Sequence, residues 1–321
     1  MRTDAPSPPP HGPLPRVHFD LTTVQLFIAT AELGGVTKAA ERMHLAPAAA
    51  SRRILELESQ LGLSLFERRP HGMALTEAGR AMLAHARSIT HSVLRMQDDA
   101  ASYAGGDQGV VRIAAPKSAV IQFLPADIER CATRCPGVRI DLQEMNSQIV
   151  LQALERGMVD LGIYEAGLGT CELPSLPYRS DRLVVVTPRE HALAGRARLA
   201  LDDILSCDVI GLGAGSAISL MLERLAGEAG RILRMPMRVG GFDSIAALVA
   251  QGLGIAVMPQ AVARAVAGGS RFARVPIEGG WSERRFVLCH RPPASLSRAA
   301  QGVVRVFSEP PTPTANPAST K

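Results

Sequence analysis

A chain of 321 residues with 46% apolar and 20% charged residues is long enough for two or three packed domains and has the composition of a globular protein. The formal net charge of +5 favours a nucleic-acid partner only weakly, since residues 19–106 hold nine basic and nine acidic side chains. No apolar run approaches the length of a membrane span and no apolar signal segment opens the chain, which argues against a membrane protein and predicts a cytoplasmic location.

The first predicted elements are a tail and a supporting helix. Residues 1–18 are rich in proline, so we expect a disordered or polyproline-like tail there, and a second loose tail at residues 309–321. Thr22 and Gln25 have the spacing of a capping box, which predicts a helix that ends at residues 34–35. One apolar side of this helix would support the helix pair that follows.

Two short helices with a break between them are predicted next. We expect the first to begin at Thr37 as its N-cap and the second to begin with Pro47, after a break at residues 44–46. Helical spacing predicts that one side of the second helix is buried through Ala50, Ile54, Leu57 and Leu61. The opposite side is small and basic, which suits the major groove of duplex DNA.

A hairpin is predicted after Gly62, which ends the second helix. Residues 63–66 and 73–75 have the pattern of short strands, and residues 67–72 between them carry two arginines. We expect this hairpin to lie along the DNA backbone as a wing, which completes a winged helix-turn-helix domain over residues 19–76. The candidate DNA-binding residues are Thr37, Pro47, Ala48, Ser51, Arg52, Arg53, Arg68 and Arg69.

A long linker helix is predicted from a cap at Thr76 to about Tyr103, followed by a flexible hinge, over residues 77–106. Such a helix would span ~40 Å. Apolar residues alternate along it at spacings of four and three, which predicts a seam that packs on the same helix of a second subunit; the alternative is packing on its own chain. The seam residues are Met82, Ala86, Ile89, Val93 and Met96.

From Val110 onward strands alternate with helices, which predicts an α/β domain over residues 107–308. The expected strands are VVRIAA, VRIDLQE, DLGIYE, RLVVVTP, DVIGLG, MRVGGF, GIAVMP and RRFVLCH, with helices at about 121–131, 149–156, 216–229 and 243–251. Two lobes joined by crossing strands would result, the second at about residues 181–275. We expect a closing helix at about Leu296–Phe307 to pack back on the first lobe.

Ligands of open α/β sheets bind at the carboxyl ends of strands, where helix N-termini offer free amides. Four such junctions carry the candidate effector-binding residues Lys117, Ser118, Asn146, Ser147, Ser216 and Phe242. Each serine taken alone could instead be a plain helix N-cap. Together the junctions predict a pocket between the lobes for a small molecule with a carboxylate or other anionic group.

Motifs of catalysis, metal binding and cofactor binding are not found in the sequence. GLGAGSA lacks the endings of a phosphate loop or dinucleotide site, no GxSxG elbow occurs, and the histidines show no HExxH spacing. The five cysteines form no Cys-X-X-Cys pair, so we expect neither a zinc site nor a disulfide framework. We therefore expect a protein that is not an enzyme, has no metal or cofactor, and responds only to a small-molecule effector.

A family resemblance rests on residues 37–69, TKAAERMHLAPAAASRRILELESQLGLSLFERR, and on LTEAGR at residues 75–80. This pattern resembles the DNA-binding domain of LysR-type transcriptional regulators, and with the remaining elements the likeness covers nearly the whole chain. The resemblance implies a periplasmic-binding-protein-like effector domain, a homodimer or homotetramer on double-stranded DNA, and contact with RNA polymerase. One departure is Ala46-Pro47-Ala48, where the family usually carries Ser-Gln-Pro.

Three alternatives remain open at this stage. A redox sensor is suggested by Cys131 and Cys135, four apart on a predicted helix, although the segment where peroxide-sensing members of the family carry a cysteine, here residues 213–219, has none. A solute-binding protein would share the two lobes but not the N-terminal module. An enzyme would bind its substrate between the lobes and use the N-terminal helices only as structure.

Overall fold

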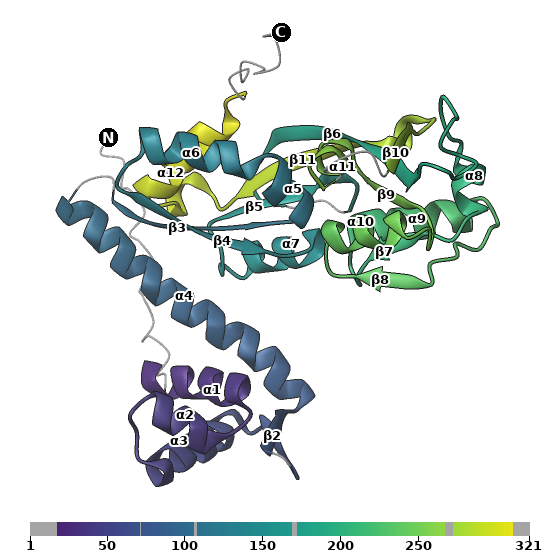
Figure 1. Cartoon of the computed structure of the whole chain (residues 1–321). Coiled ribbons are helices and arrows are strands. Elements are labelled where there is room, and N and C mark those ends of the chain that lie inside the picture. Colours follow the sequence, from purple (N-terminus) through teal and green to yellow (C-terminus); the bar gives the residue numbers. More distant parts are fainter. Residues whose placement is uncertain (1–17, 71, 106–107, 169–171, 267–271, 311–321) are drawn as a thin grey trace, which may run out of the picture. The chain divides into compact units, whose positions relative to one another are not determined.

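The computed structural model describes residues 18–70, 72–105, 108–168, 172–266 and 272–310, so most of both predicted tails and Gly106 of the predicted hinge lie outside the described residues. The chain divides into two compact units, Met1–Val93 and Leu94–Lys321, and the division falls within the long helix α4 (Glu77–Gly105). Each unit is described by itself (Figure 1). In the described part of the chain no helix is both long and apolar enough to span a membrane.

The first unit contains the helices α1 (Leu21–Leu33), α2 (Val36–Arg42) and α3 (Pro47–Leu61) around one apolar core. The predicted capping box at Thr22 is wrong: Asp20 is the N-cap of α1, because its carboxylate accepts the Thr23 N–H at 2.7 Å. The predicted N-cap Thr37 is also wrong, since α2 already begins at Val36 after Gly35. Thr37 therefore lies exposed in the first turn of α2.

The predicted ends of α1 and α3 are confirmed. Gly34 and Gly62 follow the two helices with φ values of 68° and 67°, the left-handed conformation that a glycine adopts without strain. Pro47 stands at the first position of α3, where its missing N–H costs no hydrogen bond.

The wing strands differ from the prediction in position. They are β1 (Phe66–Arg69) and β2 (Gly72–Leu75), paired antiparallel from Phe66 opposite Leu75 to Arg69 opposite Gly72. Residues 63–65 lie outside the paired strand, and the Glu58 carboxylate accepts the amide of Leu65 at 2.7 Å. Arg68 and Arg69 therefore lie in a strand, and not in the loop at the tip.

Helix α4 begins as predicted, with the Thr76 hydroxyl accepting the Gly79 N–H at 2.9 Å. The residues of its predicted seam differ in how far they are buried. Met82 and Ala86 pack in the core of the first unit, which is the own-chain alternative. Farther along, Val93 is half-buried, and Ile89 and Met96 are 39% and 66% exposed. An association of α4 with a second copy therefore remains a prediction for the later turns.

The second unit has a first lobe built on a sheet in the order β4-β3-β5-β11-β6. Its strands are β3 (Gly109–Ala115), β4 (Val138–Glu144), β5 (Leu161–Glu165), β6 (Ser175–Pro188) and β11 (Glu283–His290). β3 is parallel to β4 and β5, whereas β11 is antiparallel to β5 and β6. Every residue of β5 is buried, as expected for a central strand covered on both sides.

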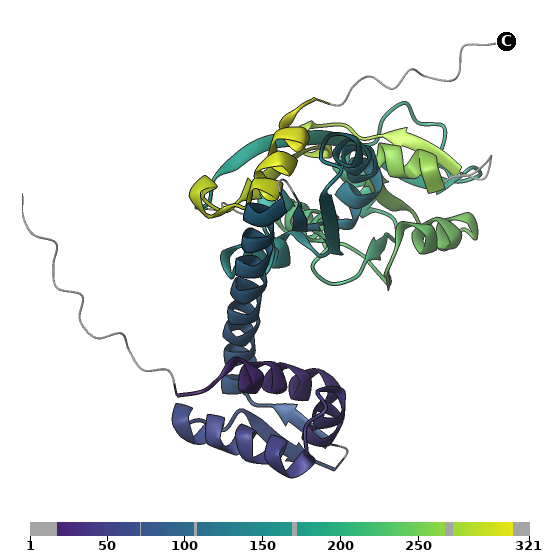
Figure 2. The ribbon, with the colours of Figure 1, turned by 90° about the vertical axis from the view of Figure 1, so that its left-hand side faces the viewer.

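Helices α5 (Lys117–Gln122), α6 (Leu124–Arg134), α7 (Ser147–Glu155) and α12 (Arg298–Ser308) pack on this sheet. The single helix predicted at 121–131 is wrong: Pro125 has no N–H to continue a helix, so α5 ends and α6 begins around Phe123. The closing helix is confirmed, because α12 lies beside α6 and shares a core with β3 (Figure 2).

The second lobe is joined to the first by β6, whose residues 175–182 pair with β11 and whose residues 183–188 pair with β9 (Ala256–Pro259) and β10 (Phe272–Pro276). The predicted strand at 182–188 is the second half of this 14-residue element. The parallel pair β7 (Ile210–Leu212) and β8 (Met237–Val239) extends this lobe. The helices of the second lobe are α8 (Leu201–Leu205), α9 (Ala217–Glu228), α10 (Phe242–Ala250) and α11 (Gln260–Val266). The described part of the second unit also contains short 3-10 turns, which are η1 (Ala166–Leu168), η2 (Gly280–Ser282) and η3 (Pro293–Ser295). Two α/β lobes are therefore present, as predicted.

Candidate functional sites: a helix-turn-helix surface and an interlobe pocket

The turn between α2 and α3 is short and tightly bonded. His44 has a φ of 54°, and the Leu45 N–H donates to the Ala40 carbonyl at 2.8 Å. Ala40 and Ala50 are completely buried, so that their small side chains let the two helices approach closely. The turn and these alanines together fix the outward side of α3.

The exposed side of α3 carries several of the predicted DNA-binding residues. Ala48, Ser51 and Arg52 are exposed, and Leu55 is 64% exposed. The Arg52 Nε donates to the Glu56 carboxylate at 2.7 Å, one helical turn away. Such an exposed pair stabilises a helix by only about 0.3–0.5 kcal/mol, so a phosphate group can replace it.

The side chain of Arg53 points toward the start of α1. Its Nη1 donates to both Asp20 oxygens, at 3.0 and 2.9 Å, and to the Thr23 hydroxyl at 3.0 Å. Hydrogen bonds from the Thr23 side chain and backbone, followed by the bond from Arg53, lower the pKa of Asp20 to about 2. The predicted DNA contact of Arg53 therefore competes with an existing contact to the start of α1.

The two arginines of the wing differ in their ion-pair partners. Arg69 donates through Nε to Glu67 at 3.1 Å. Arg68 is exposed and has no ion-pair partner among the residues that the structure describes. Arg68 is therefore the freer cation for a phosphate group.

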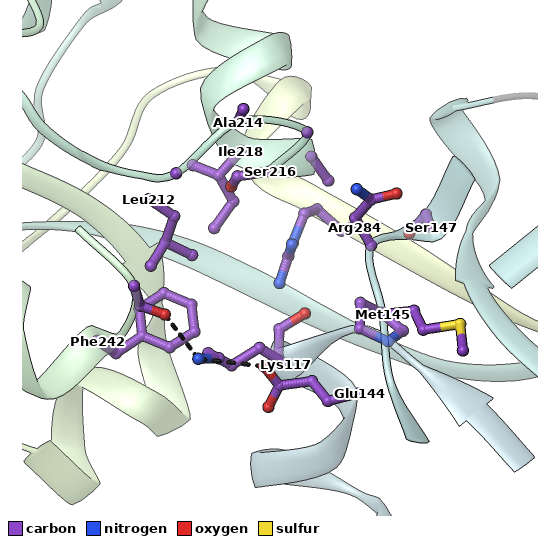
Figure 3. A pocket seen from close by; sticks show the side chains of 17 residues that line it. Lys117, Glu144, Met145, Ser147, Leu212, Ala214, Ser216, Ile218, Phe242 and Arg284 are labelled. Atoms are coloured by element: carbon purple, nitrogen blue, oxygen red, sulfur yellow. Dashed lines mark hydrogen bonds and ion pairs between the residues drawn. The ribbon is translucent and has the colours of Figure 1, made fainter. Parts of the chain in front are cut away.

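The second unit has a pocket of about 260 Å³ between its lobes, at the carboxyl ends of strands. All six candidate effector-binding residues line it, and they come from the four predicted junctions (Figure 3). Met145, Leu212, Ile218 and Phe242 provide apolar surface. The volume is slightly below the roughly 300–1,000 Å³ of most ligand sites, which suits a small metabolite.

Lys117 spans the two lobes. Its Nζ donates to the Gly240 carbonyl of the second lobe at 2.6 Å and lies 3.1 Å from the Glu144 carboxylate of the first lobe (Figure 3). The ammonium group has three protons, so it can bind a further acceptor in the pocket. Glu144 reduces the positive charge that an anion would meet.

The polar neutral residues differ in availability. Asn146 caps α7 by accepting the Ile149 N–H at 2.9 Å, and the Ser147 hydroxyl accepts the Glu165 N–H at 3.3 Å. The hydrogen bonds of these two side chains are those of a helix cap and of a structural contact, and not those of a ligand site. The hydroxyls of Ser118 and Ser216 have no hydrogen-bond partner within the described residues, so they are free to bind a ligand.

Gly215 allows the lobes to come together at this pocket. It has a φ of 80°, and a Cβ built there would lie 2.5 Å from the Asn146 Nδ2. The backbone conformation favours glycine at this position, and a side chain there would also have to displace the end of the Asn146 side chain.

Arg284 is a pocket residue that sequence reasoning missed. It is 3% exposed, and its side chain lies between the Ser216 and Lys117 sides of the pocket (Figure 3). Its Nε donates to Asp181 at 2.8 Å, and its Nη1 donates to Glu165 at 3.1 Å. Burial raises the pKa of Glu165, and the charge of Arg284 opposes that rise. The only sequence signal was a cation in the apolar strand RRFVLCH.

The cysteine chemistry expected of a redox sensor is not favoured by the described thiols. Burial, followed by the proximity of Cys135, raises the pKa of Cys131 to about 12, so this thiol stays protonated near neutral pH. Cys289 is completely buried, and Cys171 lies outside the described residues. Within the described residues no group of three or more His, Cys, Asp or Glu side chains could hold a metal ion.

Comparison with known protein families gives two matches along the chain. Residues 21–80 match the bacterial regulatory helix-turn-helix protein, lysR family, and residues 104–309 match the LysR substrate binding domain. Together they include the α3 surface and every residue of the interlobe pocket.

Individual relatives are similar over most of the chain. The sequence is 30% identical over 291 residues to the RuBisCO operon transcriptional regulator of Allochromatium vinosum, covering 91% of this chain and 96% of that protein. It is 25% identical to the HTH-type transcriptional activator CmpR of Synechocystis sp. (strain ATCC 27184 / PCC 6803 / Kazusa), covering 86% and 91%. The crystal structure of full-length CbnR complexed with its target DNA has the same fold, with a TM-score of 0.68, 23% identity, and coverage of 90% of this chain and 100% of that one.

Proposed function

Because this chain belongs to the LysR family of transcriptional regulators, we propose that it reads a dyad-symmetric DNA site through α3 and the wing and answers to a small anionic effector in the interlobe pocket. It is a DNA-binding regulator with a substrate-binding domain, and not an enzyme. The observation that carries the effector part is the convergence of four separate strand-to-helix junctions on one pocket.

The DNA-reading proposal rests on the exposed side of α3 and on the wing. Ser51 and Arg52 are exposed where an inserted helix meets base edges, and the alanine methyl groups allow close approach. Since Ala46 and Pro47 stand where the family usually carries serine and glutamine, base recognition depends on Ser51, Arg52 and methyl contacts. Arg68 and Arg69 would bind phosphates, which positions the domain without reading sequence.

Self-association would follow from the exposed part of the α4 seam. Ile89, Val93 and Met96 leave apolar surface uncovered, and a second copy of the same helix would cover it. A two-fold dimer, or a tetramer made of two such dimers, places reading heads on half-sites separated by whole duplex turns of ~34 Å. The protein would act in the cytoplasm, where DNA and RNA polymerase are its partners.

The effector proposal rests on the chemistry of the pocket walls. Helices α7, α9 and α10 begin there, and each helix N-terminus carries free N–H groups and roughly half a positive charge. Lys117 and the hydroxyls of Ser118 and Ser216 add donors, whereas Leu212 and Phe242 offer apolar contact. A small carboxylate with an apolar body fits these walls and the volume of about 260 Å³.

Lys117 would couple the effector to the position of the lobes. Its bond to the Gly240 carbonyl joins the lobes, and an anion between them would draw the ammonium group toward itself. Ligand binding would then shift the population of lobe arrangements, and through α4 the spacing of the reading heads.

Genome-wide mapping of bound DNA, followed by footprinting with the purified protein, tests the regulator proposal. We expect protected half-sites related by a dyad, and weaker, less selective binding by the Arg52→Ala variant. Purified protein that is monomeric and indifferent to duplex DNA at low ionic strength would refute this proposal.

The pocket is tested by calorimetry with small carboxylates suggested by the neighbouring genes. Lys117→Met should weaken the affinity about 10- to 100-fold, since a hydrogen bond to a charged group contributes about 1.5–3 kcal/mol. Lys38→Met, the same change on exposed α2, should leave the affinity unchanged. Equal affinities of the wild-type protein and Lys117→Met for the true effector would remove Lys117 from the site.

A further inference from the structure

Asp20 makes two kinds of contact in the first unit. As the N-cap of α1 it accepts the Thr23 N–H at 2.7 Å, and with both oxygens it accepts Arg53 Nη1 from the middle of α3. The Thr23 hydroxyl accepts the same Nη1. One guanidinium nitrogen is therefore held by three oxygens that belong to the start of another helix.

This contact differs from the other arginine pairs of the DNA-binding surface. Arg52 and Arg69 pair with carboxylates four and two residues away, in exposed positions where a phosphate group can compete. Arg53 is half-buried, with 38% of its side chain exposed, and is bound to the exposed carboxylate of Asp20, whose pKa its hydrogen bonds hold near 2. Of these three arginines, Arg53 is the one whose charge is tied to another helix.

The position of Arg53 on α3 makes that restraint relevant to DNA. Successive residues of a helix differ by about 100°, so Arg53 lies on the flank beside α1, next to the exposed side that carries Arg52. A helix about 10–12 Å across fills a major groove about 12 Å wide, with phosphates along both flanks. An unrestrained Arg53 would have a phosphate strand within the range of its long side chain.

We propose that Asp20 is a specificity-determining residue: it holds Arg53 against α1 and so withholds one positive charge from the DNA backbone. Phosphate contacts raise the affinity for every sequence equally, whereas base contacts distinguish sequences. Withholding one cation lowers non-specific affinity and leaves Ser51 and Arg52 in place. The inference rests on the proposed DNA-binding function.

The experiment compares full-length variants on a random-sequence duplex over a series of salt concentrations. Asp20→Asn keeps a good N-cap for α1 but removes the charge that holds Arg53. One additional phosphate contact steepens the plot of log affinity against log salt by about 0.9. If that contact contributes nothing at 1 M salt, the same slope makes non-specific binding about eightfold tighter at 0.1 M.

Three further variants separate the release of Arg53 from a simple change in net charge. Arg53→Gln should keep the wild-type slope, and Asp20→Asn combined with Arg53→Gln should return to it. Glu41→Gln removes one exposed carboxylate that has no ion-pair partner in the described part of the chain, and it should leave the slope unchanged. On a mapped target site, Asp20→Asn should lower the ratio of specific to non-specific affinity several-fold.

The outcomes are distinct. A slope flattened by about 0.9 in Arg53→Gln would mean that Arg53 already binds phosphate, which overturns the inference. Equal behaviour of Asp20→Asn and Glu41→Gln, or of Asp20→Asn and the wild type, would also overturn it while leaving the proposed function intact. If Asp20→Asn does not fold, Arg53→Gln alone still decides. A wild-type protein that binds no DNA would refute both.

Discussion

A buried carboxylate in the first lobe offers the sharpest stability prediction. Asp127 on α6 is 1% exposed and accepts hydrogen bonds from the Tyr178 hydroxyl, from Arg130 at 2.6 Å and from Arg179 at 3.1 Å. The two arginines also donate to backbone carbonyls at the end of α12, among them that of Val306. The carboxylate therefore holds the cations that cap the C-terminal end of the closing helix, whose dipole favours positive charge there.

Replacing Asp127 by asparagine keeps the shape of the side chain and removes its charge. Two arginines whose side chains are 18% and 10% exposed would then share only neutral acceptors, and loss of one partner from a buried ion pair costs about 3–5 kcal/mol. This is a large fraction of the 5–15 kcal/mol that is typical for the free energy of unfolding. Tyr178→Phe removes one hydrogen bond to a charged acceptor and should cost about 1.5–3 kcal/mol.

Urea denaturation, followed by circular dichroism and by the fluorescence of the single tryptophan, Trp281, measures these changes. The control is Glu309→Gln, because Glu309 pairs with Arg134 in an exposed position at the same helix end. That change should cost less than about 1 kcal/mol. If Asp127→Asn loses no more stability than Glu309→Gln, the reasoning about the buried pair is refuted.

Four further predictions concern the other sites. Arg69→Ala should weaken binding to all duplexes and flatten the salt dependence by about 0.9, and a normal slope would remove Arg69 from the phosphate contacts. Met96→Glu should dissociate the protein in sedimentation experiments without changing its circular dichroism; an unchanged mass would exclude the α4 seam from the dimer. Gly215→Ala should weaken effector binding in calorimetry, because the new methyl group displaces the Asn146 side chain and strains the backbone, and an unchanged affinity would contradict the close approach of the lobes at this position. The pKa of Asp20 is lowered to about 2 from 3.8, so its contribution to stability is complete above about pH 4 and is lost as the pH falls toward 2; denaturation curves of Asp20→Asn should lack this loss.

The predictions that hold are those that depend on neighbouring residues. Pro47 at the start of α3, Gly62 at its end and Thr76 at the start of α4 act within one helical turn, so their residue types are sufficient. The strands of the second unit are short apolar runs between glycines and prolines, and most were found. The convergence of the four junctions followed from a general rule, because the carboxyl ends of parallel strands meet at one edge.

The local errors arise where two residues could serve the same purpose. Thr22 and Asp20 could both cap α1, and the aspartate does so because its carboxylate reaches the Thr23 N–H. The strand predicted at residues 63–66 begins only at Phe66, and the amide of Leu65 before it is bound by the Glu58 side chain. Residue propensities indicate which side chains are suited to such a hydrogen bond. Which of them forms it depends on where tertiary packing places the backbone.

The sequence by itself determined the order of the elements, the two kinds of domain and the outward side of α3, because periodicity and capping are local properties. Only the tertiary structure decided which charged side chains are paired with an opposite charge and which are available to a ligand or to DNA. Arg53 meets Asp20 from 33 residues away, and Arg284 meets Asp181 and Glu165 from 103 and 119 residues away. No spacing pattern encodes such pairs, since electrostatic partners depend on distance in space, and that distance is fixed only when the apolar cores have packed.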